Sequence, residues 1–457
     1  MTDPVDLAHP RRIHVVGVGG AGMSAIASVL AAMGHRVTGS DLKSSPVTKR
    51  LAAAGVTVFI GHDAGHVGDA ELVAVSTAVS ESNPEVREAR RRGLGVLSRA
   101  EALAAVVRCR RCVAVSGTHG KTTTTSMLAL ILVEAGLRPS FLIGGDINEI
   151  GTNAVWDTGA WLVVEADESD GTFLALDPEV AVVTNVEADH LDYYGGFDEL
   201  VAAFDQFCTG PGAVVVGADD TVAAEIGRAH GADRVGTAAD ATFRIEAHTA
   251  GRTGVSFALR CDSDVLGTIS LPVTGANIAR NAAVATVTAL RVGASFADAA
   301  RALARFAGVA RRFELRGEAA GVRFVDDYAH LPTEVAAVLD AARQTGPERI
   351  VVVFQPHRYS RIGALGEQFA DSFSAADVVI VTDIFAAGEA PQPGVTGRLV
   401  ADAVVRNHPD LDVRYIAGRA ELRRHLAAVL RSGDLCLTLG AGDLTSLPDE
   451  MLAAPTW

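Results

Sequence analysis

The segment Gly117–Thr124 reads GTHGKTTT and combines the residue types that bind a nucleoside triphosphate. It follows the apolar run Val113–Val115 and precedes a segment with a helical pattern. In such loops backbone N–H groups surround phosphate oxygens, a lysine neutralises the β- and γ-phosphates, and a threonine hydroxyl ligates Mg²⁺. Lys121 is one of only three lysines in the chain. The segment therefore predicts a phosphate-binding loop of the Walker A type, shortened by two residues.

Acidic residues follow two apolar runs that come after this loop. The run Trp161–Val164 ends in EADESD, which begins at Glu165, and the run Val180–Val183 is followed by a segment that contains His190. Carboxylates at the ends of parallel strands lie beside a phosphate loop and can hold a cation. We expect Thr122, Glu165 and His190 to be metal ligands. The alternatives are a solvated acidic turn and a structural histidine.

A different glycine loop follows the apolar run Ile13–Val16. Gly17, Gly19 and Gly22 fit the pattern G-x-G-x-x-G, and Asp41 ends the next run. This pattern places a pyrophosphate at a helix N-terminus and a carboxylate on a ribose, although a tight structural turn is an alternative. An NAD-linked oxidoreductase would explain this loop alone. Both loops together favour an enzyme that uses ATP on a substrate that itself carries a nucleotide diphosphate.

The elements that must position these residues alternate between short β-branched runs and longer alanine-rich segments. This alternation is typical of βαβ units and largely parallel sheets. It restarts at Ile13, Val113 and Val322, which indicates three domains in the 457 residues. We therefore expect an α/β protein with boundaries near residues 107 and 317. The expected domains are 1–107 for the nucleotide diphosphate, 108–317 for ATP and 318–457 for a further substrate.

Composition limits the possible partners and location. The net charge of −15 argues against a general nucleic-acid or anionic-membrane binder. No apolar run approaches the roughly 20 residues that span a bilayer, so we expect no membrane insertion and a cytoplasmic protein. Five cysteines are few and odd in number, which indicates a reducing compartment. Cys109 and Cys112 form a C-x-x-C pattern, either a redox pair or two thiols beside a buried strand.

The chain resembles the Mur ligases over essentially its whole length. The motif GTHGKTTT is typical of the family, and GGAGMS and FQPHRYSR are typical of the branch that adds L-alanine. The other matching motifs are GSD (39–41), STAVS (76–80), EADESDGTF (165–173), NVEADHLD (185–192), GVARRF (308–313), DDYAHLPTE (326–334) and LGAGD (439–443).

The resemblance implies a Rossmann-like UDP-binding domain, a central P-loop ATPase domain and a C-terminal Rossmann-like domain. It implies ATP-dependent ligation of L-alanine to the lactyl carboxylate of UDP-N-acetylmuramate, through an acyl phosphate and a tetrahedral intermediate. The ligase would use Mg²⁺, with two ions expected, in cytoplasmic synthesis of peptidoglycan precursors. We expect a monomer or a homodimer.

The resemblance also assigns roles to individual residues. Lys121, Glu165, His190 and His330 would be catalytic. The UDP substrate would contact Gly19, Gly20, Ala21, Gly22, Met23, Ser24, Asp41 and Ser76. ATP would contact Gly117, Thr118, His119, Gly120, Lys121, Thr122, Thr123, Asn281, Arg312 and Asp327. L-Alanine would contact Tyr328, His330, His357, Arg358 and Arg361, although Arg358 and Arg361 could instead be a solvated surface pair.

Three positions depart from the family pattern. Leu331 stands where a second histidine is usual, and Asn277 and Ile278 replace residues of the usual adenine segment. They leave open a catalytically impaired nucleotide-binding homologue. No lysine follows Lys121, so the carbamylated lysine that several Mur ligases use for a second Mg²⁺ has no equivalent. The nearest alternative is the ligase that recycles murein tripeptide, followed by other Mur or folylpolyglutamate-type ligases.

Overall fold

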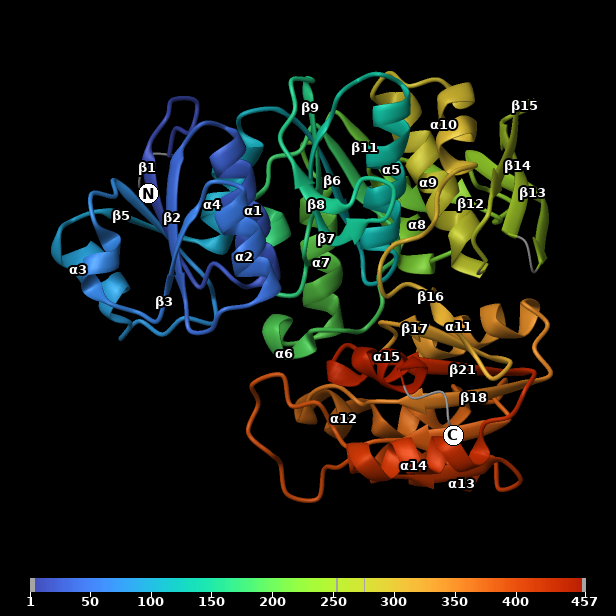
Figure 1. The fold of residues 1–457 in the computed structure, drawn as a ribbon. Coiled ribbons are helices and arrows are strands. Elements are labelled where there is room, and N and C mark those ends of the chain that lie inside the picture. The colour runs from blue at the N-terminus through green and yellow to red at the C-terminus, as the bar shows by residue number, and fades with distance from the viewer. Residues whose placement is uncertain (1–4, 252–253, 275, 454–457) are drawn as a thin grey trace. The chain divides into compact units, whose positions relative to one another are not determined.

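The computed structural model in Figure 1 describes residues 5–251, 254–274 and 276–453 and contains three β-sheets. The first sheet has five strands in the order β3-β2-β1-β4-β5, and all neighbouring strands are parallel. This order places a crevice at the carboxyl ends of β1 and β4, where the strand order reverses. The strands are β1 (Arg12–Val16), β2 (Arg36–Asp41), β3 (Thr57–Ile60), β4 (Leu72–Val75) and β5 (Gly95–Ser98).

Helices cover both faces of this sheet because its strands are apolar on both sides. Ile13 and Val15 of β1 share one core with α1 and α4, whereas Val16 shares a second core with Ala89 of α3. Helix α4 is also the connection that leads into the second sheet. The helices are α1 (Ala21–Ala32), α2 (Pro46–Ala53), α3 (Pro84–Arg91) and α4 (Arg99–Val107), with a short 3₁₀ turn at Ala64–Val67.

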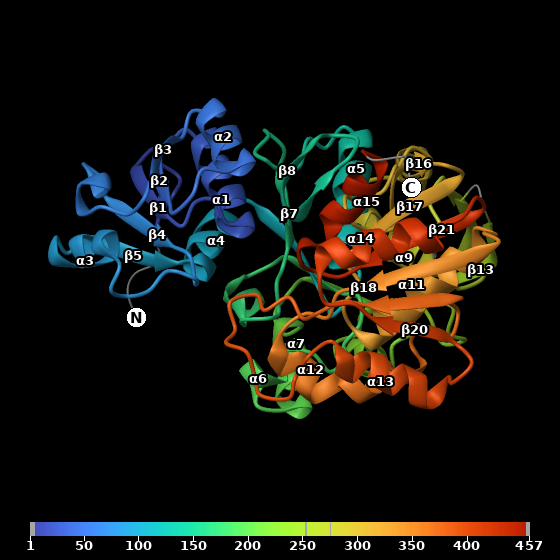
Figure 2. The same cartoon turned by 60° about the horizontal axis from the view of Figure 1, so that its bottom comes forward.

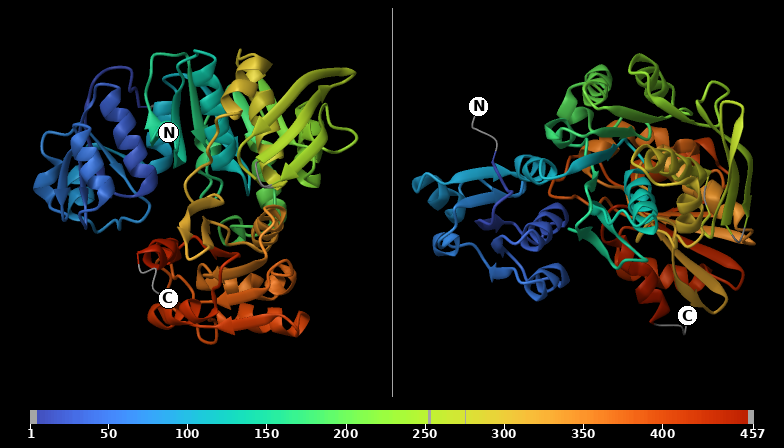
Figure 3. Two further views of the ribbon diagram at one scale, coloured as in Figure 1. Left: turned by 45° about the vertical axis from the view of Figure 1, so that its right-hand side comes forward. Right: turned by 90° about the horizontal axis from the view of Figure 1, so that it is seen from above.

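The second sheet has ten strands in the order β15-β14-β13-β12-β11-β10-β6-β9-β7-β8. Its central strand β6 pairs in parallel with β9 and β10, so the carboxyl ends of these three strands meet at one edge. The long strands β13 to β15 form one end of the sheet (yellow-green in Figure 3). The strands are β6 (Arg111–Ser116), β7 (Ser140–Ile147), β8 (Thr152–Val155), β9 (Trp161–Glu165), β10 (Val180–Val183), β11 (Ala213–Gly217), β12 (Asp233–Gly236), β13 (Phe243–Gly251), β14 (Gly254–Cys261) and β15 (Asp264–Leu271).

Six helices accompany the second sheet. The first of them, α5, starts directly after the loop that follows β6, and it is buried along most of its length. The helices are α5 (Lys121–Glu134), α6 (Leu191–Tyr194), α7 (Phe197–Phe207), α8 (Thr221–Ala229), α9 (Ala276–Arg291) and α10 (Phe296–Leu303), with a 3₁₀ turn at Thr172–Ala175.

The third sheet has six strands in the order β16-β17-β21-β18-β19-β20, and only the β16–β17 pair is antiparallel. Helices α13 and α14 lie on opposite faces of it (Figure 2). The strands are β16 (Glu314–Ala319), β17 (Val322–Asp327), β18 (Arg349–Phe354), β19 (Val378–Val381), β20 (Asp412–Tyr415) and β21 (Asp434–Leu439). The helices are α11 (Pro332–Gln344), α12 (Tyr359–Leu365), α13 (Arg398–Asn407), α14 (Arg419–Val429) and α15 (Leu447–Leu452).

The predicted α/β class with three domains is confirmed. The chain divides into two compact units, one of residues 1–246, 258–269 and 280–306 and one of residues 247–257, 270–279 and 307–457. The domain boundaries near 107 and 317 stay predictions. Within the described residues, none of the helices has the length and apolar character needed to cross a membrane.

Candidate active site

The loop between β6 and α5 follows a path that only glycine permits at two positions. Gly117 has a φ of +130°, and a Cβ there would lie 2.1 Å from the Thr184 hydroxyl oxygen. Gly120 has a φ of +79°, and its Cβ would lie 2.6 Å from the side-chain oxygen of Asn281. Both contacts are far shorter than van der Waals distance. The predicted phosphate loop is thus a close-packed turn, with Asn281 against it.

The segment after β10 braces this loop. The Asn185 side-chain oxygen accepts a hydrogen bond from the His119 backbone N–H at 2.8 Å, and Thr184 donates to the His119 carbonyl at 2.5 Å. The Thr118 hydroxyl accepts from the Glu187 N–H at 2.8 Å. His119 Nε2 lies 3.2 Å from Glu187 Oε2. These contacts fix the conformation of the loop, and none of them involves the backbone N–H groups of Lys121 or the residues that follow it.

The Lys121 ammonium lies inside the loop. Its Nζ donates to the carbonyls of Gly117 at 2.6 Å and Thr118 at 3.1 Å, and to Glu168 Oε1 at 2.8 Å. Burial opposes the charge, but Glu168, Asp167 and other carboxylates outweigh it and raise the pKa of Lys121. The side chain therefore stays protonated and is ready to neutralise a phosphate.

Glu168 contacts Lys121 and was not selected by sequence reasoning. Its side chain is buried, Oε1 accepts from Lys121, and Oε2 has no hydrogen-bond partner in the described chain. Burial raises the pKa of this carboxyl to about 7, although the charge of Lys121 lowers it. The Tyr194 hydroxyl donates to the Glu168 carbonyl at 2.5 Å and fixes the backbone. The acidic run was recognised in the sequence, but only Glu165 was selected from it.

Thr122 and Glu165, the predicted metal ligands, form a hydrogen-bonded pair beside the loop. The Thr122 hydroxyl donates to Glu165 Oε1 at 2.9 Å, and the Gly144 N–H donates to Oε2 at 2.6 Å. Hydroxyl and carboxylate oxygens suit Mg²⁺, which completes its octahedral shell with phosphate oxygens and water. Across the parts of the chain that the structure describes, no three His, Cys, Asp or Glu side chains are arranged to hold a metal. The donors therefore fit an ion that arrives with a nucleotide.

His190 lies in a strained backbone conformation just before α6. Its φ is +54°, and its Nε2 lies 3.2 Å from Asp189 Oδ2. A non-glycine residue in the left-handed region is uncommon and is frequently found at functional sites. The assignment of His190 as a metal ligand together with Glu165 stays a prediction.

The first glycine loop contacts the carboxylate of Asp41, the last residue of β2. The Gly19 N–H donates to Asp41 Oδ2 at 2.9 Å, and a Cβ on Gly19 would lie 2.8 Å from that same oxygen. Gly17 has a φ of +78° and packs against Ser76, which follows β4. The structure therefore brings together the predicted UDP residues at the crevice of the first sheet. Gly20 is the N-cap of α1, Ala21 and Gly22 are its first residues, and Met23 and Ser24 are buried within it.

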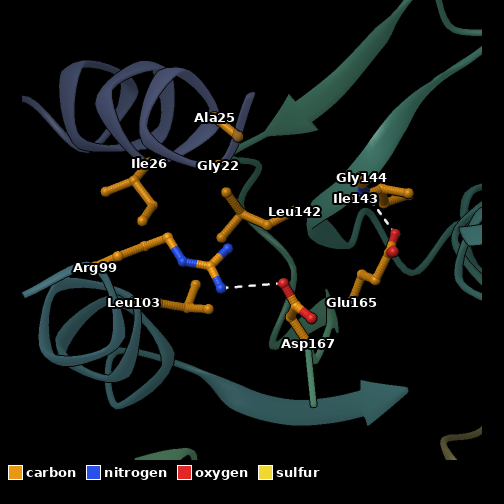
Figure 4. A pocket seen from close by; sticks show the side chains of 10 residues that line it. All are labelled: Gly22, Ala25, Ile26, Arg99, Leu103, Leu142, Ile143, Gly144, Glu165 and Asp167. Carbon is orange, nitrogen blue, oxygen red and sulfur yellow. Dashed lines mark hydrogen bonds and ion pairs between the residues drawn. The ribbon is translucent and has the colours of Figure 1, made fainter. Parts of the chain in front are cut away.

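A pocket of about 210 Å³ extends from Gly22, at the end of the first glycine loop, to Glu165 (Figure 4). Gly22 of α1 lies at one side, and Glu165 lies at the other. Arg99, the first residue of α4, reaches across and pairs with Asp167. Apolar side chains form much of the wall. The lining residues are Gly22, Ala25, Ile26, Arg99, Leu103, Leu142, Ile143, Gly144, Glu165 and Asp167.

A second cluster of predicted residues lies at the carboxyl edge of the third sheet. Tyr328 and His330 follow β17, and His357 and Arg358 follow β18. The ring of His330 lies 5.5 Å from that of Tyr328 and 5.6 Å from that of His357. Residues separated by about thirty positions in the sequence thus form one aromatic and basic group, and its assignment to L-alanine stays a prediction.

The two arginines of this cluster differ from a solvated surface pair. Arg361 is only 9% exposed, and its guanidinium donates to His357 Nδ1 at 2.9 Å. Burial, with the nearby charges of His330, Arg361 and Arg358, lowers the pKa of His357 to about 3. The imidazole is therefore neutral and accepts at Nδ1. The surface alternative is wrong for Arg361.

Arg358 carries backbone strain at the start of α12. Its φ is +65°, a value that an arginine adopts only at a cost of roughly 1–3 kcal/mol. Its buried Nε has no hydrogen-bond partner among the described residues. A strained cation with an unpaired donor is suited to an anionic ligand.

Asp327 and the arginines before β16 form a third group. Asp327 accepts hydrogen bonds from the Phe313 and Ala329 N–H groups, both at 2.7 Å, and burial raises its pKa to about 6 although Arg312 lowers it. The guanidinium carbons of Arg311 and Arg312 lie 4.8 and 5.0 Å from the centre of the Tyr328 ring. The family resemblance assigned Arg312 to ATP and assigned no role to its neighbour Arg311.

The positions that depart from the family pattern differ in their surroundings. Leu331 is buried, and the Glu334 carboxylate accepts from its N–H at 3.1 Å at the start of α11. Asn277 is exposed and Ile278 is half-buried, whereas Asn281 is buried.

The thiols of the C-x-x-C pattern, Cys109 and Cys112, are free. Cys112 is buried, and burial raises the pKa of both thiols, which disfavours redox chemistry.

Comparisons with known proteins agree with this geometry. The chain matches the models of the Mur ligase family catalytic domain over residues 12–111, the Mur ligase middle domain over 115–289 and the Mur ligase glutamate ligase domain over 311–442. The chain belongs to the Mur ligase family.

Individual relatives cover nearly the whole chain. UDP-N-acetylmuramate–L-alanine ligase of Rubrobacter xylanophilus is 46% identical over 97% of this chain and 99% of its own length. A crystal structure of UDP-N-acetylmuramate-alanine ligase from Thermotoga maritima is 28% identical, with a TM-score of 0.83 and coverage of 97% of this chain and 98% of that one. A murein peptide ligase from Psychrobacter arcticus is 25% identical, with a TM-score of 0.71 and coverage of 98% and 99%.

Proposed function

We propose that the protein joins L-alanine to the lactyl carboxylate of UDP-N-acetylmuramate and uses ATP to do so. The observation that carries this proposal is the pocket that runs from Gly22 in the first glycine loop to Glu165 beside the second. A substrate with a nucleotide diphosphate at one end and a carboxylate at the other would reach from one loop to the other. The 46% identity to a ligase of this name supports the same activity.

The reaction begins with two anions that must meet. A carboxylate is a poor electrophile, so its oxygen first attacks the γ-phosphorus of ATP, which gives an acyl phosphate and releases ADP. Lys121 neutralises the phosphate oxygens during this step, and Glu168 keeps the ammonium charged and in place. Thr122 and Glu165 would hold a Mg²⁺ ion, which would supply further charge neutralisation, and His190 would hold a second ion.

The second half of the reaction uses the third domain. The alanine amine attacks the acyl carbon, and the tetrahedral intermediate then loses phosphate. We assign the alanine carboxylate to Arg358 and Arg361, with Tyr328 and His330 beside it. Neutral His357 serves as a hydrogen-bond acceptor that orients Arg361 rather than as an acid. Asp327 and Arg312 are proposed near ATP.

The ligase that recycles murein tripeptide is the second candidate. Its structural likeness to this chain is weaker, with a TM-score of 0.71 against 0.83 for the alanine-adding enzyme. The contacts of the phosphate loop argue against a catalytically impaired homologue. Lys121 is hydrogen-bonded to Glu168, and Thr122 is hydrogen-bonded to Glu165. These contacts are present although Leu331, Asn277 and Ile278 depart from the family pattern.

The test is ADP release with ATP, UDP-N-acetylmuramate and L-alanine, and with each omitted in turn. We expect turnover only with all three, and we expect murein tripeptide to replace alanine poorly. Preference for the tripeptide would establish the second candidate. Absence of turnover with either amine would establish an impaired homologue.

The metal assignment has its own test. Glu165→Ala and His190→Ala should each shift the Mg²⁺ dependence of ligation to higher concentration. An unchanged Mg²⁺ curve for His190→Ala would leave that residue with a structural role.

We propose a cytoplasmic enzyme, since both nucleotide substrates are cytoplasmic. Sedimentation would distinguish a monomer from a homodimer.

A further inference from the structure

Arg99, the first residue of α4, connects this helix to the acidic loop after β9. Its Nη2 donates to Asp167 Oδ2 and to Asp170 Oδ2, both at 3.1 Å, and to the Thr172 hydroxyl at 3.4 Å. All three partners lie in one short segment, and Asp167 also feels the charge of Lys121. Although burial raises it, the charges of Lys121 and Arg99 lower the pKa of Asp167 to about 2. One carboxylate is thus shared between Arg99 and the reactive lysine.

The other two nitrogens of Arg99 are not used in this way. Its Nε is buried without a hydrogen-bond partner, and Nη1 bonds to none of the residues that the structure describes. Nη1 lies beside Gly22, because a Cβ built on that glycine would be 3.1 Å from it. Figure 4 shows the guanidinium in the pocket between α1 and Asp167. The two N–H groups of Nη1 are therefore available to a ligand in this pocket.

An arginine in this position is suited to an anion. Guanidinium donors match phosphate and carboxylate oxygens in geometry and charge. The first glycine loop, residues 17–22, contains no lysine or arginine of its own. A diphosphate bound there would need a cation from another element.

We propose that Arg99 binds the diphosphate of the UDP substrate through Nη1 while Nη2 stays on Asp167 and Asp170. This inference rests on the proposed function, because it takes the UDP-linked substrate as the ligand. The position of Nη1 at Gly22, in the first turn of the helix that follows the glycine loop, favours the diphosphate over the lactyl carboxylate. One guanidinium would then contact both the substrate and the loop that carries Glu165 and Glu168.

The proposal predicts that the two nucleotide sites are coupled. A bound diphosphate fixes Arg99, and Arg99 fixes the acidic loop beside the phosphate loop. UDP ligands should therefore tighten the binding of a non-hydrolysable ATP analogue, and the ATP analogue should tighten UDP ligands by the same factor. Removal of the guanidinium should abolish this mutual effect.

The experiment is calorimetric binding of UDP, UDP-N-acetylglucosamine and UDP-N-acetylmuramate to the full chain and its variants. Only the last ligand has the lactyl carboxylate, whereas all three have the diphosphate. We expect Arg99→Ala to weaken all three by about tenfold or more, and Arg99→Lys to weaken them less. Arg50→Ala is the matched control: Arg50 pairs with Asp146 at 3.1 Å, is exposed, and lies outside the pocket. It should change each Kd by less than about twofold.

The outcomes separate the possible roles of Arg99. Selective loss of UDP-N-acetylmuramate binding would assign Arg99 to the lactyl carboxylate and overturn the diphosphate proposal. Unchanged binding of all three, or an unchanged mutual effect with the ATP analogue, would make Arg99 a structural tether and also overturn it. Retained binding of the ATP analogue by Arg99→Ala shows that the variant is folded. Failure of the unaltered protein to bind UDP-N-acetylmuramate would instead overturn the proposed function.

Discussion

The two glycine loops follow central strands of their sheets, β1 and β6, yet they differ in where the positive charge is. The loop at Gly117–Thr122 contains its own cation, Lys121, which is already paired with a buried carboxylate. The loop at Gly17–Gly22 contains no basic residue, and its Gly19 N–H is bonded to Asp41. The nearest guanidinium in the pocket comes from α4.

This difference fits two separate tasks, catalysis at the second loop and substrate binding at the first. The phosphate that reacts changes its bonding, so a charge fixed inside the loop lowers the energy of the transition state. A diphosphate that is only held needs affinity, which backbone donors and a cation from a neighbouring element can supply. The comparison predicts that substitutions at the second loop affect rate, whereas those at the first affect binding.

The largest effect is expected for Lys121→Ala. Loss of the ammonium should reduce kcat by about 10³-fold or more, because it removes charge neutralisation in the transition state. Binding of UDP-N-acetylmuramate should remain, which calorimetry would check. Lys49→Ala, which alters an exposed lysine on α2, is the control. A Lys121→Ala variant with a tenth of normal activity would remove the distinction between the loops.

Glu168→Gln should give the next largest loss. The amide keeps the shape but leaves Lys121 without its buried counter-charge, so we expect kcat/KM for ATP to fall by roughly 10- to 100-fold. Glu168→Asp should recover part of the loss. KM for the UDP substrate should not change. Equal damage to both substrates would indicate a general structural role for Glu168.

The acidic loop after β9 shows which features of the site can be predicted from the sequence and which cannot. Apolar β-branched runs are local signals, and they predicted that Glu165 and His190 lie at or after the ends of strands. His357 and Arg358 were assigned only from the family resemblance. Which carboxylate faces Lys121 depends on the turn in which the Gly171 N–H donates to the Glu168 carbonyl at 3.1 Å. Such a choice of side-chain direction leaves no pattern in the sequence.

Long-range pairs were also beyond prediction. Arg99 meets Asp167 across 68 positions, and nothing about a lone arginine before an alanine-rich helix indicates its partner. The same holds for the buried Glu85 on α3. It accepts from Ser40 at 2.5 Å and lies 2.9 Å from His66 Nδ1 and 3.1 Å from His62 Nδ1. Its place among histidines follows only from the packing of the first sheet.

Arg358→Ala should affect one substrate alone. The loss of a charge-assisted pair, about 1.5–3 kcal/mol, should raise KM for L-alanine by roughly 10- to 100-fold. Binding of ATP and the UDP substrate should persist, because the arginine lies in the third domain. The check is KM for alanine alongside equilibrium binding of both nucleotides. Loss of nucleotide binding with an unchanged KM for alanine would refute the assignment.

The smallest expected effect on activity concerns Glu85 and pH. Burial opposes its charge, but contacts with His14, Ser40 and His66 outweigh burial and lower its pKa from 4.5 to about 2. A lowered pKa stabilises the folded state above pH 5, and this contribution, roughly 3 kcal/mol, is lost as pH falls toward 2. Hydrogen exchange of the first domain should show that loss.

The matched variant for this prediction is Glu85→Gln. Its side chain does not titrate, so the decline in protection between pH 5 and pH 2 should be smaller by about the same amount. An identical pH dependence in both proteins would show that Glu85 does not control acid stability. Ligation at neutral pH by the unaltered protein should not depend on this titration.

The most direct test of the central claim, that the second loop promotes attack of a carboxylate on ATP, follows an oxygen atom. UDP-N-acetylmuramate labelled with ¹⁸O in its lactyl carboxylate is ligated to L-alanine, and the released phosphate is analysed by mass spectrometry. Because the attacking oxygen stays with phosphorus when the amine displaces phosphate, we predict one ¹⁸O atom in each phosphate. Unlabelled phosphate would contradict the account.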